Sequence, residues 1–280
     1  MGFAMASRLV DAGHEVVLFN RTRSKAQPLV DRGASLAGSP AEASRGAELL
    51  VTMLSDDDAV EQVVLGPDGA ASALGRGCVH ASMSTISPVC SRRVADAHDA
   101  AGQLYVASPV LGRPDAAARG ELTIVAAGKP EAIDRARPVF DVLGKQTRVV
   151  GAEPEQANAV KLGVNFVLAS ILEVLGEAYA LAEGHGVDAH TFLEIVNDSL
   201  LKSPVVGAYG KRIADGAFEP GGFSLALGAK DVRLAVETGA RASVAMPIAS
   251  ALHECFVAAM REGMSDRDWA VIGRASAARR

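Results

Sequence analysis

With 280 residues, the chain is long enough for two domains, and its 49% hydrophobic content can supply their cores. A net charge of -5 argues against a general nucleic-acid binder, because such proteins carry a basic excess. The three cysteines lie far apart, which excludes a disulfide framework, and no apolar run reaches the ~20 residues of a membrane span. We therefore expect a soluble, reduced, cytoplasmic protein without an export leader.

The first half of the chain alternates short β-rich runs with amphipathic segments. The predicted strands are residues 15–20, 48–54, 78–82, 103–107, 122–126 and 147–150. The predicted helices among them are residues 2–12, 41–46, 57–65 and 87–101. This alternation predicts an α/β fold, with a Rossmann-like, doubly wound, mostly parallel sheet covered by helices on both faces.

From residue 152 onward the pattern becomes helical. Apolar residues recur at positions 160, 164, 167, 171, 175 and 178, which predicts one long, largely buried helix that runs to about Glu183. Further helices are predicted at residues 188–199, 207–215, 224–239 and 248–262. The change of pattern near Gly151 predicts two domains, a Rossmann-like domain over 1–151 and an all-helical domain over 152–280.

The opening stretch, MGFAMASRLVDAGHEVVLFNRT, has the form of the second half of a βαβ nucleotide-binding unit. In such a unit a glycine-rich turn and the following helix N-terminus bind the pyrophosphate, and Gly2 stands where the last glycine is expected. Where NAD enzymes place a carboxylate after the second strand, this chain has Asn20, Arg21 and Thr22. A guanidinium and a hydroxyl suit the additional phosphate of NADP. The alternative is that Arg21 only solvates a loop.

Five stretches, in order and spacing, resemble the β-hydroxyacid dehydrogenase family, which includes 3-hydroxyisobutyrate dehydrogenase and the glyoxylate/succinic semialdehyde reductases. They are the opening stretch, SMSTISP (82–88), SPVLGRPDAAARGELTIVAAG (108–128), NAVKLGVNF (158–166) and GGFSLALGAKDVRLA (221–235). The resemblance implies NADP(H) as cofactor, with NAD(H) as the alternative, a small carboxylate-bearing substrate, and a homodimer or homotetramer. It also implies a first strand and a Gly-x-Gly turn, about a dozen residues that we expect to be missing by N-terminal truncation.

Reduction of a carbonyl by hydride builds negative charge on oxygen, so the site needs a proton donor nearby. Lys161 and Asn165 are four residues apart on the long predicted helix and therefore project from one face. The resemblance places the family's catalytic lysine at Lys161. We expect Lys161 to act as general acid/base in a cleft between the domains, with Asn165 holding a substrate hydroxyl or orienting the ammonium. The alternative is a solvated helix lysine.

Residues 109–113 resemble a family turn whose backbone and serine hydroxyl bind the substrate carboxylate. This chain has Leu111 where the family has that serine, and Arg113 where the family has a second glycine. Backbone donation at Gly112 and Arg113 is still expected if Arg113 tolerates the turn. The Arg113 side chain either pairs with the carboxylate or points to solvent.

The other site residues also follow from the resemblance. Those expected at the cofactor are Met53, Leu54, Thr85 and Lys230, and those expected at the substrate are Thr85, Phe223 and Asp231. Thr85 has a second interpretation as a helix N-cap. For Lys230 and Asp231 the alternative is an exposed pair on a helix.

No metal site is expected. The six histidines show no ligand spacing, and the run SDDDAV (55–60) is typical of a helix N-terminus that complements the dipole. Two other functions stay open. One is an imine reductase of the same architecture, favoured by Leu111 and Arg113 and disfavoured by Lys161. The other is a non-catalytic NADP-binding or scaffold protein, suggested by the absent glycine turn.

Overall fold

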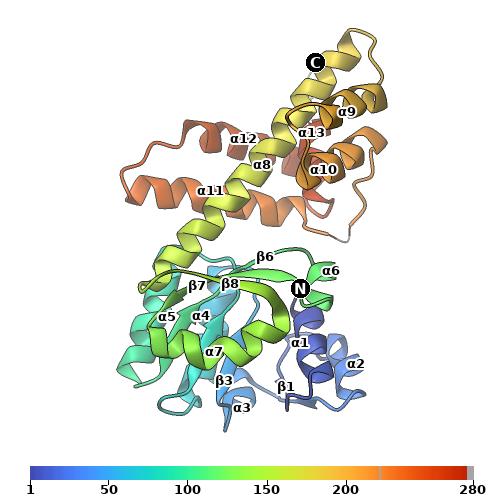
Figure 1. Cartoon of the computed structure of the whole chain (residues 1–280). Coiled ribbons are helices and arrows are strands. Elements are labelled where there is room, and N and C mark those ends of the chain that lie inside the picture. Colours follow the sequence, from blue (N-terminus) through green and yellow to red (C-terminus); the bar gives the residue numbers. More distant parts are fainter. Residues whose placement is uncertain (221, 276–280) are drawn as a thin grey trace. The chain divides into compact units, whose positions relative to one another are not determined.

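The computed structural model describes residues 1–220 and 222–275 of the chain. The chain divides into two compact units, here called unit 1 (Met1–Lys161) and unit 2 (Leu162–Arg280), and Figure 1 shows a sheet-containing unit 1 and a helical unit 2. The first turns of the long helix belong to unit 1 because Ala157 lies in its core and Glu155 pairs with Arg92 at 2.6 Å. The Rossmann-like fold with a helical C-terminal domain is thereby confirmed.

Unit 1 contains eight strands among its described residues. They are β1 (Val17–Leu18), β2 (Ser35–Leu36), β3 (Leu49–Thr52), β4 (Val79–Ser82), β5 (Leu104–Ala107), β6 (Val110–Leu111), β7 (Leu122–Gly128) and β8 (Gly144–Gly151). The helices are α1 (Gly2–Asp11), α2 (Gln27–Val30), α3 (Pro40–Ser44), α4 (Asp57–Leu65), α5 (Pro88–Ala100), α6 (Pro114–Ala118) and α7 (Pro130–Leu143). Two single 3₁₀ turns are η1 (Arg23–Lys25) and η2 (Ala70–Ser72).

The strands form two sheets. β1 and β2 pair in parallel as a two-stranded sheet, and the other six follow the order β3-β4-β5-β7-β6, with β8 also on β7. Pairing is parallel in β3-β4, β4-β5 and β7-β8, and antiparallel where β7 meets β5 and β6. The doubly wound fold has the strand order 3-2-1-4-5-6. In that order β1 and β3 of this chain correspond to strands 2 and 4, and strand 1 lies between them. The expected first strand and glycine turn stay a prediction.

Both faces of the sheet are buried at its central strands β4, β5 and β7. Alternate residues of β5 and β7 enter opposite clusters, so Val106 packs with α1 and α7 while Tyr105 and Ala107 pack with α4 and α5. Small and β-branched residues fill these clusters, as the low aromatic content requires. Helices on both faces explain why the strands read as continuous apolar runs rather than alternating ones.

Local sequence signals explain where many helices begin. Ser39, Ser87 and Ser203 each cap a helix by accepting a backbone N–H three residues on, and each is followed by proline at the first helical position. In the acidic run, Asp56 caps α4 by accepting from the Ala59 N–H at 2.8 Å. The described residues contain no group of three or more potential metal ligands, and the acidic run acts as a helix start.

Unit 2 is helical throughout its described part. Its helices are the greater part of α8 (Pro154–Gly184), then α9 (Ala189–Asp198), α10 (Pro204–Asp215), α11 (Leu225–Arg241), α12 (Pro247–Arg261), η3 (Trp269–Val271) and α13 (Ile272–Ala275). One face of α8, with Ala169, Leu172 and Tyr179, lies in the core of this unit. Figure 1 shows α8 as the longest helix of the chain.

Within the described residues, α8 is the single helix long and apolar enough to cross a membrane by length and composition, whereas the sequence predicted no such run. Its mean hydropathy over that window is 1.7, and 44% of the window is buried inside the chain. A core helix packed on one side passes the same test, and the buried face of α8 identifies it as one.

A chain of hydrogen-bonded, buried polar side chains runs through unit 1 from β3 through β4 to α5. Thr52 Oγ1 lies 2.9 Å from His80 Nε2, and His80 Nδ1 lies 2.9 Å from His98 Nε2. His98 Nδ1 lies 2.6 Å from Gln103 Oε1. Both histidines are fully buried in unit 1.

The partners of Gln103 set the direction of its hydrogen bond to His98, and neutral rings then set the other two. Gln103 donates its amide nitrogen to two backbone carbonyls in residues 71–74, so its oxygen must accept from His98 Nδ1. A neutral His98 then accepts at Nε2 from His80 Nδ1, and His80 accepts at Nε2 from the Thr52 hydroxyl. Every group is satisfied with both rings neutral, and burial lowers the pKa of both His80 and His98.

Candidate active site

The loop after β1 carries the residues predicted to bind the cofactor phosphate. Asn20 Nδ2 donates to the Thr22 carbonyl at 2.8 Å, which holds the loop in a tight turn. Arg21 lies between them, is exposed, and has no hydrogen bond or ion pair within the part of the chain that the structure describes. Its guanidinium is therefore available to an anion.

The start of α1 lies against the carboxyl end of β3. A Cβ atom added to Gly2 would lie 3.8 Å from the Cβ and the carbonyl oxygen of Met53. The next residue, Leu54, donates its N–H to Ser84 Oγ at 2.8 Å, which joins this edge to the end of β4. Three predicted cofactor residues thus meet at the edge where parallel sheets bind dinucleotides.

Thr85 lies in the segment between β4 and α5. The N-cap of α5 is Ser87, which accepts from the Cys90 N–H at 3.0 Å and donates its own N–H to Asp57 at 2.8 Å. The interpretation of Thr85 as the cap is wrong, because Pro88 occupies the first helical position and puts the cap at the residue before it. A role for Thr85 at the cofactor stays a prediction.

The turn after β6 keeps a glycine where only glycine fits. Gly112 has a φ of +144°, and a Cβ there would lie 2.7 Å from Leu122 Cδ2. Arg113 has an extended backbone, with φ at −102°, and caps the short helix α6. The turn therefore tolerates Arg113, because the unusual conformation falls on Gly112 alone.

Lys161 and Asn165 lie one turn apart on α8, as predicted, and both side chains are buried. Lys161 is only 9% exposed, so the alternative of a solvated helix lysine is wrong. A largely buried ammonium is costly unless polar groups surround it, and lysines in such places commonly serve chemistry.

Asn165 is oriented by a carboxylate from a different helix of unit 2. Its Nδ2 donates to Oδ2 of Asp231 on α11, and Oδ1 of the same carboxylate lies 2.9 Å from Lys230 Nζ. Asp231 is 1% exposed, so the alternative of an exposed Lys230–Asp231 pair is wrong. An ionised carboxylate only accepts, so it fixes the Asn165 amide nitrogen toward itself and turns Oδ1 the other way.

Phe223 is half-buried and packs against the core of unit 2. Its ring meets Trp269 edge to face at a centroid distance of 4.8 Å, and its carbonyl accepts from the Trp269 N–H at 2.8 Å. These contacts account for an aromatic residue at this position. Its contact with a substrate stays a prediction.

The sequence analysis gave no role to Asn158. This side chain is 1% exposed, and its Oδ1 has no hydrogen-bond partner among the described residues. It precedes Lys161 by three residues and Asn165 by seven, so all three project from one face of α8. The polar spacing i, i+3, i+7 on an otherwise apolar helix was a signal that could have identified it.

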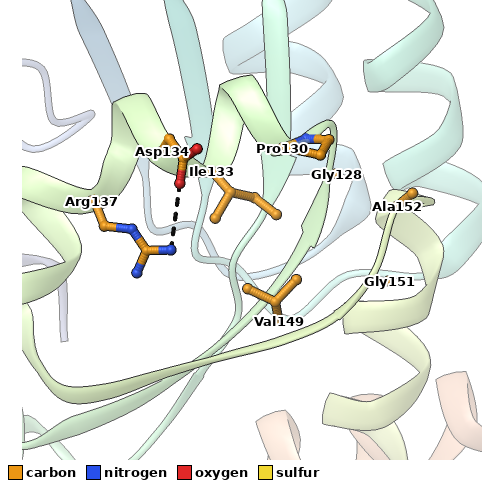
Figure 2. Close-up of a pocket in the computed structure, with 8 residues that line it drawn as sticks. All are labelled: Gly128, Pro130, Ile133, Asp134, Arg137, Val149, Gly151 and Ala152. Atoms are coloured by element: carbon orange, nitrogen blue, oxygen red, sulfur yellow. Dashed lines mark hydrogen bonds and ion pairs between the residues drawn. The ribbon is translucent and has the colours of Figure 1, made fainter.

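A shallow hollow on unit 1 lies apart from these residues. Figure 2 shows Ile133 and Val149 across it, with the Asp134–Arg137 pair, 3.4 Å apart, at its border. No predicted site residue lines it, and it has no place in the candidate site.

The fold and these residues define a class of protein, an NAD(P)-binding oxidoreductase with an α/β domain and a helical domain. Residues 1–151 match the family model for the NAD-binding domain of 6-phosphogluconate dehydrogenase. Residues 156–275 match the model for the NAD-binding part of NADP-dependent 3-hydroxyisobutyrate dehydrogenase. The chain belongs to the β-hydroxyacid dehydrogenase family, as the sequence motifs predicted.

Individual relatives agree with this placement. The chain is 42% identical to the uncharacterized oxidoreductase YfjR of Bacillus subtilis, over 97% of this chain and 95% of the relative. It is 33% identical to glyoxylate/succinic semialdehyde reductase 1 of Arabidopsis thaliana, over 97% and 93%. A Mycobacterium tuberculosis 3-hydroxyisobutyrate dehydrogenase structure with L-serine matches with a TM-score of 0.87 and 27% identity, over 98% and 94%.

Imine reductases share the fold more distantly. The structure of an imine reductase from Pseudomonas matches with a TM-score of 0.63 and 23% identity, over 99% of this chain and 96% of that one. At that identity the match concerns the fold alone. The 3-hydroxyisobutyrate dehydrogenase structure therefore matches this chain's fold more closely than the imine reductase structure does.

Proposed function

We propose that the chain is an NADP-preferring dehydrogenase or reductase that acts on a small β-hydroxyacid or the corresponding aldehyde acid, as a homo-oligomer. The observation that carries the proposal is the buried array of Lys161, Asn165 and Asp231, built on two helices around one polar face. The relatives named above, which include a semialdehyde reductase and a hydroxyacid dehydrogenase, support the substrate class.

When bound, a nicotinamide cofactor would supply or accept the hydride of the reaction. Lys161 donates a proton to the carbonyl oxygen on reduction and removes it on oxidation, which neutralises the developing alkoxide. Asn165 presents Oδ1 as an acceptor for a hydroxyl or ammonium hydrogen. Asp231 acts through Asn165 as a positioning residue, because a displaced polar group loses much of its effect on the rate.

The preference for NADP is proposed from the loop after β1. Arg21 is exposed and without a partner among the described residues, and no carboxylate stands at positions 20–22 to accept from ribose hydroxyls. Asn20 and Thr22 flank it in a tight turn held by their own hydrogen bond. These residues fit the additional phosphate of NADP, which a guanidinium can bind through two N–H groups.

The substrate carboxylate is proposed to bind at the turn of Gly112 and Arg113. Leu111 cannot supply the hydroxyl that the family's serine offers, so backbone N–H groups and the Arg113 guanidinium remain as donors. The replacement of this serine by Leu111 affects which acid the enzyme accepts as substrate more than which reaction it catalyses.

Replacement of the lysine tests the chemistry. Lys161→Ala should lower kcat by several orders of magnitude and leave NADPH affinity, measured by fluorescence titration, nearly unchanged. Lys202→Ala, at an exposed position of unit 2, is the control and should retain wild-type kcat. Equal losses of kcat and NADPH affinity would mean a structural role, and absent NADPH binding in the wild type would favour a scaffold protein.

Cofactor choice has its own test. Arg21→Asp should shift the ratio of kcat/KM for NADPH over NADH toward NADH, because it replaces a phosphate ligand by a repelling carboxylate. Arg45→Asp makes the same charge change on an exposed residue of unit 1 and should leave the ratio as it is. An unaltered ratio in Arg21→Asp would remove this residue from the phosphate site. Higher activity on a cyclic imine than on a semialdehyde would favour the imine reductase.

A further inference from the structure

Asn158 brings a buried amide to α8, one helical turn before Lys161. Only 1% of its surface is exposed, and its Oδ1 has no hydrogen-bond partner among the described residues. A buried acceptor without a donor is destabilising, and such groups are few in native proteins. An apolar side chain of similar volume would fill the same space without that cost, so packing alone does not explain an amide at this position.

Burial along this part of α8 does not follow hydrophobicity. Val160 is 40% exposed and Val167 is 54% exposed, so the prediction that the apolar row of this helix is buried is wrong at these two positions. The polar residues Asn158, Lys161 and Asn165 are instead the buried ones, at 1%, 9% and 5% exposure. Tertiary packing therefore encloses the polar face of the helix, which is the reverse of what the hydrophobic effect alone favours.

Helix geometry directs the Lys161 side chain toward the Asn158 amide. Each Cα–Cβ bond of an α-helix tilts toward the N-terminus, and long side chains lean over the residues three and four positions earlier. For Lys161 these residues are Asn158 and Ala157. Since Ala157 has only a methyl group, Asn158 supplies the polar group on the side toward which the lysine leans.

A buried ammonium needs several acceptors at once. Lysine carries three N–H donors and can accept none, so a single partner does not satisfy it. In the proposed reaction one donor faces the substrate oxygen, and the others must be met by the protein because burial removes water from the ammonium. The Oδ1 atom of Asn158 offers two lone pairs for this purpose.

We propose that Oδ1 of Asn158 accepts a hydrogen bond from the Lys161 ammonium during catalysis and thereby sets its orientation and proton affinity. This inference rests on the proposed function of Lys161 as general acid/base. Asn158 is a positioning residue, because it acts through the lysine. A neutral acceptor favours the charged lysine less strongly than a carboxylate would, so the ammonium is held and can still release its proton.

The titration of Lys161 tests this contact without any need for turnover. The chain contains seven lysines, so carbon-13 NMR of protein labelled at the lysine ε-carbons gives few signals, and Lys161→Met identifies the signal of Lys161. Asn158→Leu should lower the proton affinity of Lys161 about tenfold, because the ammonium loses an acceptor. Asn158→Asp should raise it by at least about tenfold, because a neighbouring carboxylate favours the charged form.

Gln156→Glu is the matched control. It makes the same exchange of an amide for a carboxylate on an exposed residue of α8, and positions 156 and 161 point to different sides of the helix. We expect it to leave the titration of Lys161 unchanged. Lys230 and Asp231 on α11 also bring charge to the polar face of α8, through Asn165. They are the same in every protein compared, so their effect is common to all.

The pH dependence of kcat/KM for carbonyl reduction gives a second readout. Reduction requires the protonated lysine, so activity falls as the pH rises through the titration of this group in the free enzyme. Asn158→Leu should begin this fall at lower pH than the wild type, and Asn158→Asp at higher pH. A residue that only supports the fold would change the Tm or the level of kcat without moving the profile in opposite directions.

Circular dichroism establishes that the variants are folded, and Asn158→Ala takes the place of Asn158→Leu if that variant is not. An unchanged titration of Lys161 in both variants would overturn the contact and leave Oδ1 to a buried water. Shifts of the same sign in both variants would overturn it as well.

The two hypotheses fail separately. If the wild type does not reduce aldehyde acids but the two variants shift the titration in opposite directions, the proposed function is wrong and the contact stands. If the wild type is active and Lys161 titrates identically in all variants, the contact is wrong and the proposed function stands.

Discussion

Acid should destabilise unit 1 through its two buried histidines. The hydrogen-bond chain from Thr52 to Gln103 is complete with both His80 and His98 neutral, so neither ring needs an additional proton in the folded chain. Protonation of both rings would place His80 Nδ1–H and His98 Nε2–H face to face at 2.9 Å, and even one added proton would put a charge in a fully buried site. Burial holds the pKa of His80 well below its usual range, with the neighbouring His98 as a second cause, and burial also lowers the pKa of His98.

The sign and size of the effect follow from proton linkage. In the unfolded chain both histidines take up protons as the pH falls through about 6.5, whereas the folded chain takes up none until its lower pKa values are reached. The stabilising contribution is therefore fully present above pH 6.5 and is lost progressively below it. Between pH 7.5 and 5.5, the two groups together should lower the free energy of unfolding by up to about 3 kcal/mol.

Urea denaturation at the two pH values measures this loss. The variant His80→Gln/His98→Gln keeps polar side chains at both positions and removes both titrations, so its loss should be smaller than that of the wild type by up to about 3 kcal/mol. Carboxylates that titrate near pH 5.5 affect both proteins equally and cancel in the difference. The same loss in wild type and double variant would refute the assignment of neutral rings.

Two further predictions concern single positions. Asp231→Asn should lower kcat by ~10²-fold with a smaller change in KM, because the new amide side chain at position 231 can donate as well as accept and therefore no longer fixes the orientation of the Asn165 amide. Asp231→Glu should restore part of the rate in steady-state assays. If kcat stays at the wild-type value in Asp231→Asn, Asp231 does not position Asn165. Gly112→Ala should lower the free energy of unfolding by about 1–3 kcal/mol through its positive φ and the contact with Leu122, as thermal denaturation would show. An unchanged Tm would mean that the turn can rearrange.

Elements with strong local signals were predictable from the sequence. α4 begins at Asp57 and ends at Leu65, as predicted, because Asp56 caps it and Gly66 ends it. In contrast, β2 and β6 were missed, since two residues are too few to show a periodicity. α7 was also missed, although Pro130 marks its start, because Pro138 inside the segment reads as a helix breaker.

The candidate site was predictable only in part. Lys161 and Asn165 are neighbours through helix geometry alone, so their spacing sufficed. The contact between Asn165 and Asp231 joins residues 66 positions apart and depends on how α11 packs against α8. The missing hydrogen-bond partner of Asn158 Oδ1 likewise becomes evident only from the tertiary structure, which gives the positions of the surrounding polar groups.

By itself, the sequence determined the class of fold, the start of several helices and the family, because periodicity, capping residues and ordered motifs are local properties that short-range physics governs. Tertiary packing alone decided which apolar face of α8 enters the core, which turn residue carries the positive φ, and which carboxylate orients the amide of Asn165. Burial and hydrogen bonding between distant segments are properties of the packed chain, since the same side chain is solvated or buried according to what folds against it.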